Sequence, residues 1–96
     1  MLSKLYRVGM LSPDDIDRTV FTEVKFREGY DIDEVDAFVA AVRASIAAGP
    51  SAAGALGSAD VRRTRFQPTK FRPGYDQNEV DALLEQAEDT LRTFGR

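Results

Sequence analysis

One acidic run could do chemistry in this chain, because closely spaced carboxylates can bind a hard cation or share a proton. This run contains Asp31, Asp33, Glu34 and Asp36. Val35 stands where a calcium loop would need an oxygen ligand, and a helix start accounts for the acids through capping and the helix dipole. The chain has no histidine and no cysteine, which removes the most common catalytic bases, nucleophiles and soft metal ligands. We therefore predict that the protein is not an enzyme and binds no metal and no cofactor.

A second kind of chemistry comes from a Phe-Arg pair that occurs twice, as Phe26-Arg27 and as Phe71-Arg72. An aromatic ring beside a cation is a candidate contact for an anionic partner. Basic and acidic side chains balance in the stretch around the first pair, whereas the stretch around the second pair is basic only. We therefore expect binding to an anionic surface or partner to depend chiefly on Lys70, Phe71, Arg72, Arg62, Arg63 and Arg65.

Two other interpretations of these residues stay open. An aromatic residue at the start of a loop is often part of the core, so Phe26 and Phe71 could instead pack inside the domain. The sequence VRRTRF at residues 61–66 has the composition of a nucleic-acid contact. The net charge of −3 argues against nucleic acid as a partner.

The Phe-Arg pairs belong to an internal repeat. At an offset of 45 residues, segments 15–39 and 60–84 share the runs Lys-Phe-Arg, Gly-Tyr-Asp and Glu-Val-Asp-Ala. Between the copies lies AAGPSAAGAL, which has the composition of a linker. We predict an N-terminal extension at residues 1–10, a first repeat at 11–46, a linker at 47–55 and a second repeat at 56–96.

The pattern of each repeat is a short helix, a loop and a long helix. Ser12, followed by proline, predicts the start of the first short helix. Gly29 predicts a sharp turn in the loop, and Pro68 and Pro73 disfavour long strands in the second copy. We therefore expect loops with at most short β-hairpins.

The long helices are predicted to begin at Asp31 and Asp76. Each of these residues precedes a glutamate by three positions, the spacing of a capping box in which the glutamate reaches back to the cap. The apolar residues that follow recur at i, i+3, i+4 and i+7, so each helix has one apolar stripe that needs a partner. We expect a helix-pairing interface formed by Val35, Phe38, Val39, Val42, Ile46, Val80, Leu83, Leu84 and Leu91. The predicted fold class is mainly α, a coiled-coil-like pseudo-dimer of the two repeats.

The partner of each stripe is expected to be the other stripe, in the same chain or in a homodimer. A parallel pair within one chain requires the linker to return along a helix of about 16 residues, or about 24 Å. The linker can span about 33 Å when it is extended, so this arrangement is feasible but taut. An antiparallel pair and a swapped homodimer stay open.

The segment LSPDDIDRTVFTEVKFREGYDIDEVDAFVAAV at residues 11–42 resembles the N-terminal domain of the DivIVA family, the scaffolds of bacterial cell poles and septa. The resemblance rests on the Leu-Ser-Pro start, the phenylalanine after the short helix, and the Gly-Tyr-Asp and Glu-Val-Asp runs. The second copy keeps the phenylalanine and both runs but begins LGSADV, without the proline. The resemblance implies parallel long helices whose intertwined loops present a Phe-Arg tip to membrane.

This chain departs from the family pattern in three ways. One additional residue, Glu28 or Pro73, separates each Phe-Arg pair from the following glycine. The chain ends at Arg96, without the long downstream coiled coil through which family members polymerise. The two repeats in one chain are similar to the family's homodimer fused into a single polypeptide.

The resemblance implies a non-enzymatic scaffold or localisation module of bacterial cell division or polar growth, which binds anionic membrane through the loop tips. The alternative is an adaptor that docks on a protein partner or on a full-length DivIVA-like protein without lipid contact. No apolar run approaches the roughly 20 residues of a spanning helix, and the N-terminus lacks the apolar stretch of a signal peptide. We therefore expect a cytoplasmic protein, peripheral at the inner face of the cell membrane, whose partners are itself, the membrane surface and division or polar-growth proteins.

Overall fold

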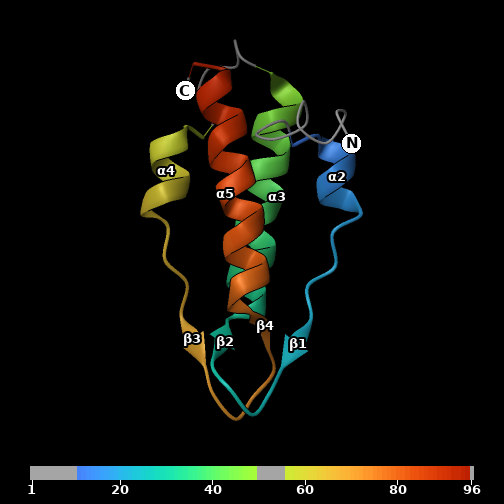
Figure 1. Cartoon of the computed structure of the whole chain (residues 1–96), viewed down its shortest axis with the longest axis vertical. Coiled ribbons are helices and arrows are strands. Elements are labelled where there is room, and N and C mark those ends of the chain that lie inside the picture. The colour runs from blue at the N-terminus through green and yellow to red at the C-terminus, as the bar shows by residue number, and fades with distance from the viewer. Residues whose placement is uncertain (1–10, 50–55, 96) are drawn as a thin grey trace, which may run out of the picture.

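The computed structural model describes residues 11–49 and 56–95, which form helices and short strands. The elements are α2 (Pro13–Asp17), β1 (Glu23–Val24), β2 (Gly29–Tyr30), α3 (Ile32–Ala48), α4 (Ser58–Arg63), β3 (Pro68–Thr69), β4 (Gly74–Asp76) and α5 (Gln77–Thr93). The long helices α3 and α5 both begin beside the strands and run away from them side by side, with α2 and α4 on their flanks (Figure 1). The pair is therefore parallel.

The strands form one antiparallel sheet in the order β1-β4-β2-β3. Each pairing joins one repeat to the other: β1 pairs with β4, β4 with β2, and β2 with β3. Tyr30 lies opposite Tyr75 in the central pair. The loops of the two repeats are thus interlocked through their main chains.

The predicted fold class was wrong, because the loops build a four-stranded sheet that belongs to both repeats. The prediction of a helical pseudo-dimer with at most local hairpins missed this sheet for a physical reason. Strands of two or three residues are too short to show an alternating pattern. Their partners lie in the other repeat, and the bonds that join them come from the backbone, which leaves no signature in the side chains.

The apolar stripes of the long helices lie in one core. The buried residues of the predicted interface are Val35, Val42, Ile46, Val80, Leu83, Leu84 and Leu91, whereas Phe38 and Val39 are half-buried against this core. Leu11, Ile16 and Val61, which come from outside the long helices, are also buried in it. The short helices therefore complete a core that the two long helices do not close alone.

Most of the path from the end of α3 back to the sheet is made by described residues of the second repeat. The helix α4 lies beside the far part of α5, and from there the chain runs down to β3 (Figure 1). The return path is thus made largely by the second repeat itself, so the length argument against a parallel pair does not apply. Residues 1–10 of the predicted extension and 50–55 of the predicted linker lie outside the described residues, and Ala47 and Ala48 belong to α3.

Asp31 and Asp76 cap the long helices as predicted. The glutamates three positions later do not bond back to these caps, as a capping box would require. Asp31 accepts the N–H of Glu34 at 3.0 Å, and the equivalent Asp76 caps α5. The Glu34 carboxylate instead accepts the N–H of Gln67, in the other repeat, at 2.7 Å. Glu79, its equivalent, accepts the N–H of a residue in the first repeat at 2.6 Å. The start of each long helix is therefore tied to the opposite loop.

One buried position distinguishes the two halves of the sheet and gives a prediction. Thr69 is 1% exposed, and among the described residues its hydroxyl oxygen has no hydrogen-bond partner. Val24 is the equivalent residue of the first repeat. A buried hydroxyl without a partner costs about 1–3 kcal/mol, and valine has the same shape without that cost. We expect Thr69→Val to raise the free energy of unfolding by about 1 kcal/mol, measured by urea denaturation.

The converse change, Val24→Thr, provides the control. It puts a hydroxyl at the equivalent position, which is only half-buried, and should lower the free energy of unfolding by less than about 1 kcal/mol. A loss of stability in Thr69→Val would contradict the prediction and would show that the hydroxyl has a partner in solution.

Candidate functional site

The loop turns 25–28 and 70–73, which we call the tip, lie where the two loops cross below the sheet (Figure 1). Phe26 is 82% exposed and Phe71 is 69% exposed. Apart from Val20, these are the exposed large apolar residues of the described part of the chain. Neither ring packs in the core, and both lie at the same end of the molecule.

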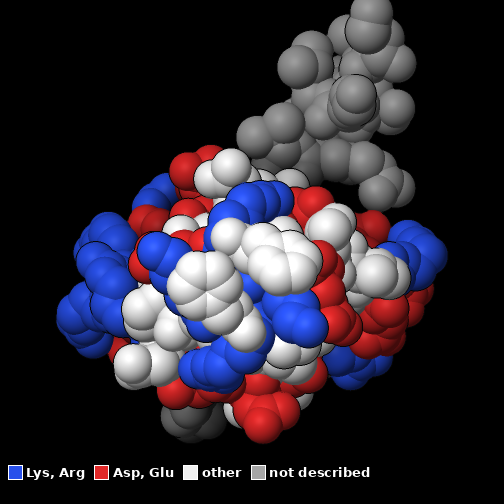
Figure 2. Space-filling model, turned by 90° about the horizontal axis from the view of Figure 1, so that it is seen from below, with Lys and Arg blue, Asp and Glu red and all other residues white. Residues whose placement is uncertain are grey.

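Basic side chains surround these rings. The face seen from below has uncharged side chains at its centre, basic ones around them and acidic ones mainly toward the edge (Figure 2). The Nζ atom of Lys25 lies 5.9 Å from the centre of the Phe26 ring, and that of Lys70 lies 5.6 Å from the Phe71 ring. Both contacts are within the range of a cation–π interaction. Each ring is thus presented together with an ammonium group.

The tip arginines connect the turns to the long helices of the opposite repeat. Arg27 donates to Asp76, the cap of α5, at 2.6 Å. Arg72 forms a longer ion pair of 3.5 Å with Asp31, the cap of α3. The hydrogen bond from Arg27, followed by that from the N–H of Glu79, lowers the pKa of the Asp76 carboxyl. These contacts hold each turn against the helix start of the other repeat.

The tyrosines after the glycines form a second pair of contacts between the repeats. The Tyr30 hydroxyl donates to Asp81 and the Tyr75 hydroxyl donates to Asp36, each at 2.8 Å. Burial, followed by the hydrogen bond to the carboxylate, raises the pKa of each tyrosine to about 12. Both hydroxyls therefore stay protonated at neutral pH and act as donors. In the acidic run that could have formed a cation site or an acid–base pair, Asp31 caps α3 and Asp36 accepts the Tyr75 hydroxyl.

The two turns differ in backbone conformation. Phe71 has φ of 63°, in the left-handed region, where a bulky residue costs about 1–2 kcal/mol. Phe26 does not have a positive φ. Pro73 disfavours helical backbone at the preceding Arg72, and Phe71 is the left-handed residue of the second turn. The second ring is therefore held in its exposed position at a cost in conformational energy.

The predicted arginine cluster does not belong to the tip. Arg62 and Arg63 lie at the end of α4, on the flank of α5 (Figure 1). Arg62 pairs with Glu88 at 3.5 Å, and Arg63 pairs with Asp60 at 3.1 Å. Arg65 donates to main-chain carbonyls nearby. The predicted excess of charge in the second repeat is thus located mostly away from its turn.

Sequence reasoning missed Lys25, which lies at the tip beside Phe26. Charge was counted along each segment, so the acidic residues Glu23 and Glu28 cancelled it. The repeat alignment contained the signal, because Lys25 is equivalent to Lys70. At the tip the first turn has two basic residues and one acidic residue and the second has two basic residues, so the turns differ by a single charge.

A scan against protein-family models gives no match to this chain, and searches of curated proteins and of solved structures give none either. Within residues 11–49 and 56–95, no helix combines the length and the apolar character needed to cross a membrane.

Proposed function

We propose that the protein is a non-enzymatic scaffold or localisation module of bacterial cell division or polar growth, similar to DivIVA, which binds anionic membrane through its tip. The observation that carries this proposal is the pair of exposed rings, Phe26 and Phe71, beside four basic side chains at one end of the molecule. The resemblance of residues 11–42 to the DivIVA N-terminal domain supports the same assignment.

The energies of these groups suit a weak and reversible anchor. Burial of a phenylalanine side chain contributes about 2 kcal/mol, and a basic residue near an anionic leaflet contributes about 1 kcal/mol. Two rings and the two tip lysines together give about 6 kcal/mol, which is comparable to a single myristoyl chain. A module with this affinity would bind the membrane surface reversibly and would not insert permanently.

The rigidity of the tip favours simultaneous binding by both rings. Phe26 and Phe71 come from different repeats, but the shared sheet and the ion pairs of the tip arginines hold the two turns together. The second ring therefore meets the membrane at a high effective concentration once the first is bound. Each ring should contribute to the same binding event.

Vesicle flotation tests this proposal. The protein should float with vesicles that contain phosphatidylglycerol, less so as salt increases, and not with pure phosphatidylcholine. We expect Phe26→Ala and Phe71→Ala each to weaken the partition coefficient by about tenfold, because each removes most of one buried ring. The two losses should be similar, since both rings lie at one tip.

The charge contribution has a matched control. Lys25→Gln and Lys70→Gln remove charges at the tip and should each weaken binding about fivefold. Arg63→Gln removes the same charge on the flank and should have little effect. Equal losses in all three variants would show that the membrane does not meet the tip. A protein that fails to float but binds a full-length DivIVA-like polypeptide would be the adaptor instead.

A further inference from the structure

The sheet that the two repeats share has two edges, β1 and β3. In an antiparallel pair, successive residues direct their backbone N–H and C=O groups alternately toward the partner strand and away from it. The carbonyl of Thr22 accepts the N–H of Asp76, and the next residue, Glu23, lies opposite Tyr75. The backbone groups of Glu23 therefore point away from the sheet, and by the same alternation the next residue that does so is Lys25. The β1 edge thus offers main-chain donors and acceptors to a further strand.

The β3 edge is closed at the equivalent place. The carbonyl of Gln67 accepts the N–H of Asp31, so the backbone of the following Pro68 points outward. Proline has no N–H to donate, and a proline at an edge prevents the addition of a strand. On the segment that leads to β3, Arg65 adds a charge at the position that corresponds to Val20. Of the two edges, β1 is therefore the one that is open to a partner.

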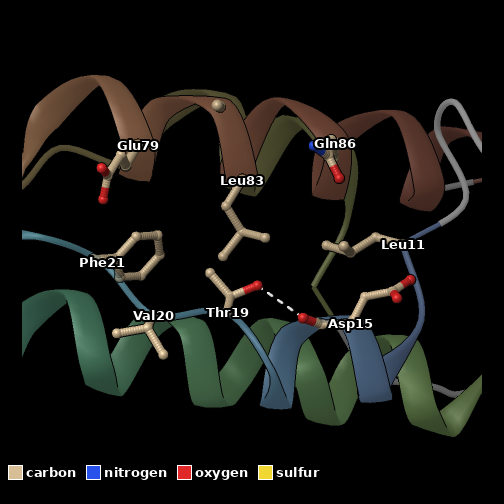
Figure 3. Close-up of a pocket in the computed structure, with 9 residues that line it drawn as sticks. Leu11, Asp15, Thr19, Val20, Phe21, Glu79, Leu83 and Gln86 are labelled. Atoms are coloured by element: carbon tan, nitrogen blue, oxygen red, sulfur yellow. Dashed lines mark hydrogen bonds between the residues drawn. The ribbon is translucent and has the colours of Figure 1, made fainter.

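Exposed apolar side chains flank the β1 edge. Val20, three residues before β1, is 88% exposed, and its side chain points away from Leu83 and α5 (Figure 3). Phe26 follows β1 by two residues and is 82% exposed. These are the two most exposed large apolar residues of the described chain. A strand added at β1 would lie between them.

The charges along this edge are complementary to a second copy of the same edge. When two β1 strands pair antiparallel about Val24, Glu23 of each copy lies opposite Lys25 of the other. Both residues direct their backbone groups toward the other strand in this register, and their opposite charges attract across it. The ion pairs among the described residues involve neither Glu23 nor Lys25. The same register places the Phe26 turn of each copy beside the Val20 segment of the other.

We infer that two copies of the chain pair through their β1 edges in this register. The contact consists of two short strands and their flanking side chains, so the dimer should be weak and reversible. Because β1 runs toward the tip, antiparallel pairing directs the two tips in opposite directions (Figure 1). In terms of the proposed function, on which this consequence rests, a dimer presents one tip to a membrane and withholds the other.

Sedimentation equilibrium without lipid tests the pairing. The native chain should dimerise with a dissociation constant of about 0.1 mM. Glu23→Lys and Lys25→Glu each place like charges opposite one another at two contacts, so each should weaken dimerisation about tenfold. An equimolar mixture of these two variants has opposite charges at both contacts again and should associate as strongly as the native chain. Glu23→Pro copies the closed β3 edge and should abolish association.

Lys70→Glu provides the matched control, because it makes the same change of charge at the equivalent residue beside the closed edge. It should leave dimerisation unchanged, and its mixture with Glu23→Lys should not associate as the native chain does. A native chain that stays monomeric at about 1 mM would overturn the inference. So would a mixture of Glu23→Lys and Lys25→Glu that stays monomeric although circular dichroism shows both variants folded. Since no lipid is present, these outcomes are independent of vesicle binding.

Discussion

Replacement of Leu91 by alanine is expected to lower the free energy of unfolding by about 3 kcal/mol. Leu91 is 0% exposed and is the largest of the fully buried side chains of the described chain. It belongs to the core that α3, α5 and the short helices share. Removal of its side chain loses the transfer free energy of the buried atoms and leaves a cavity in a core that is already thin. Urea denaturation followed by circular dichroism measures this loss.

Since small domains are stable by only about 5–15 kcal/mol, this one change would remove a large share of the total. Val39→Ala is the comparison, because Val39 is only half-buried at the edge of the same core and should cost about 1 kcal/mol. Equal losses for the two variants would contradict the core described here. A midpoint of unfolding that rises with protein concentration would show that the long helices pair between chains.

The second large effect is expected at Gly29, where the two loops cross. A Cβ atom at this position would lie 2.8 Å from the carbonyl oxygen of Tyr75 and 2.9 Å from a methyl group of Val24. The backbone of Tyr75 cannot move away without loss of the central strand pair. We expect Gly29→Ala to lower the free energy of unfolding by about 2–3 kcal/mol. It should also weaken vesicle binding, because the crossing holds the tip together.

Gly95→Ala separates this close contact from the ordinary cost of replacing a glycine. Gly95 has φ of 86°, and among the described residues no neighbouring atom lies within 4 Å of the point that a Cβ atom would occupy. Its substitution should therefore cost about 1 kcal/mol through the backbone alone. It should leave vesicle binding unchanged. A loss in Gly29→Ala no greater than that in Gly95→Ala would show that the sheet adjusts at the crossing.

Much of the candidate site could be predicted because its residues recur in both repeats. The Phe-Arg pairs stand at equivalent positions, and both phenylalanines are exposed on turns that cross at one tip. The cluster of Arg62, Arg63 and Arg65 was assigned to the same surface because it is close to Lys70 in sequence. An extended segment separates them in space, since each residue of extended chain advances by about 3.3 Å. These arginines are therefore close to Lys70 in the sequence but not on the surface of the folded protein.

The role of Gly29 shows a second limit of the sequence. A glycine before a tyrosine predicted a sharp turn, but Gly29 lies in β2 and does not have a positive φ. It is required because the other loop passes beside it. A close approach between segments that are 45 residues apart depends on the fold, and a single residue type cannot distinguish it from a turn.

The sequence by itself determined the repeat, the caps at Ser12, Asp31 and Asp76, and the apolar sides of the long helices. Each of these depends on side chains within one or two helical turns, so local spacing is sufficient. Only the tertiary structure decided that the loops interlock in one sheet, that Glu34 and Glu79 bind the opposite repeat, and that the long helices run parallel. These features depend on main-chain hydrogen bonds and close contacts between distant segments, for which the amino-acid pattern carries no local signal.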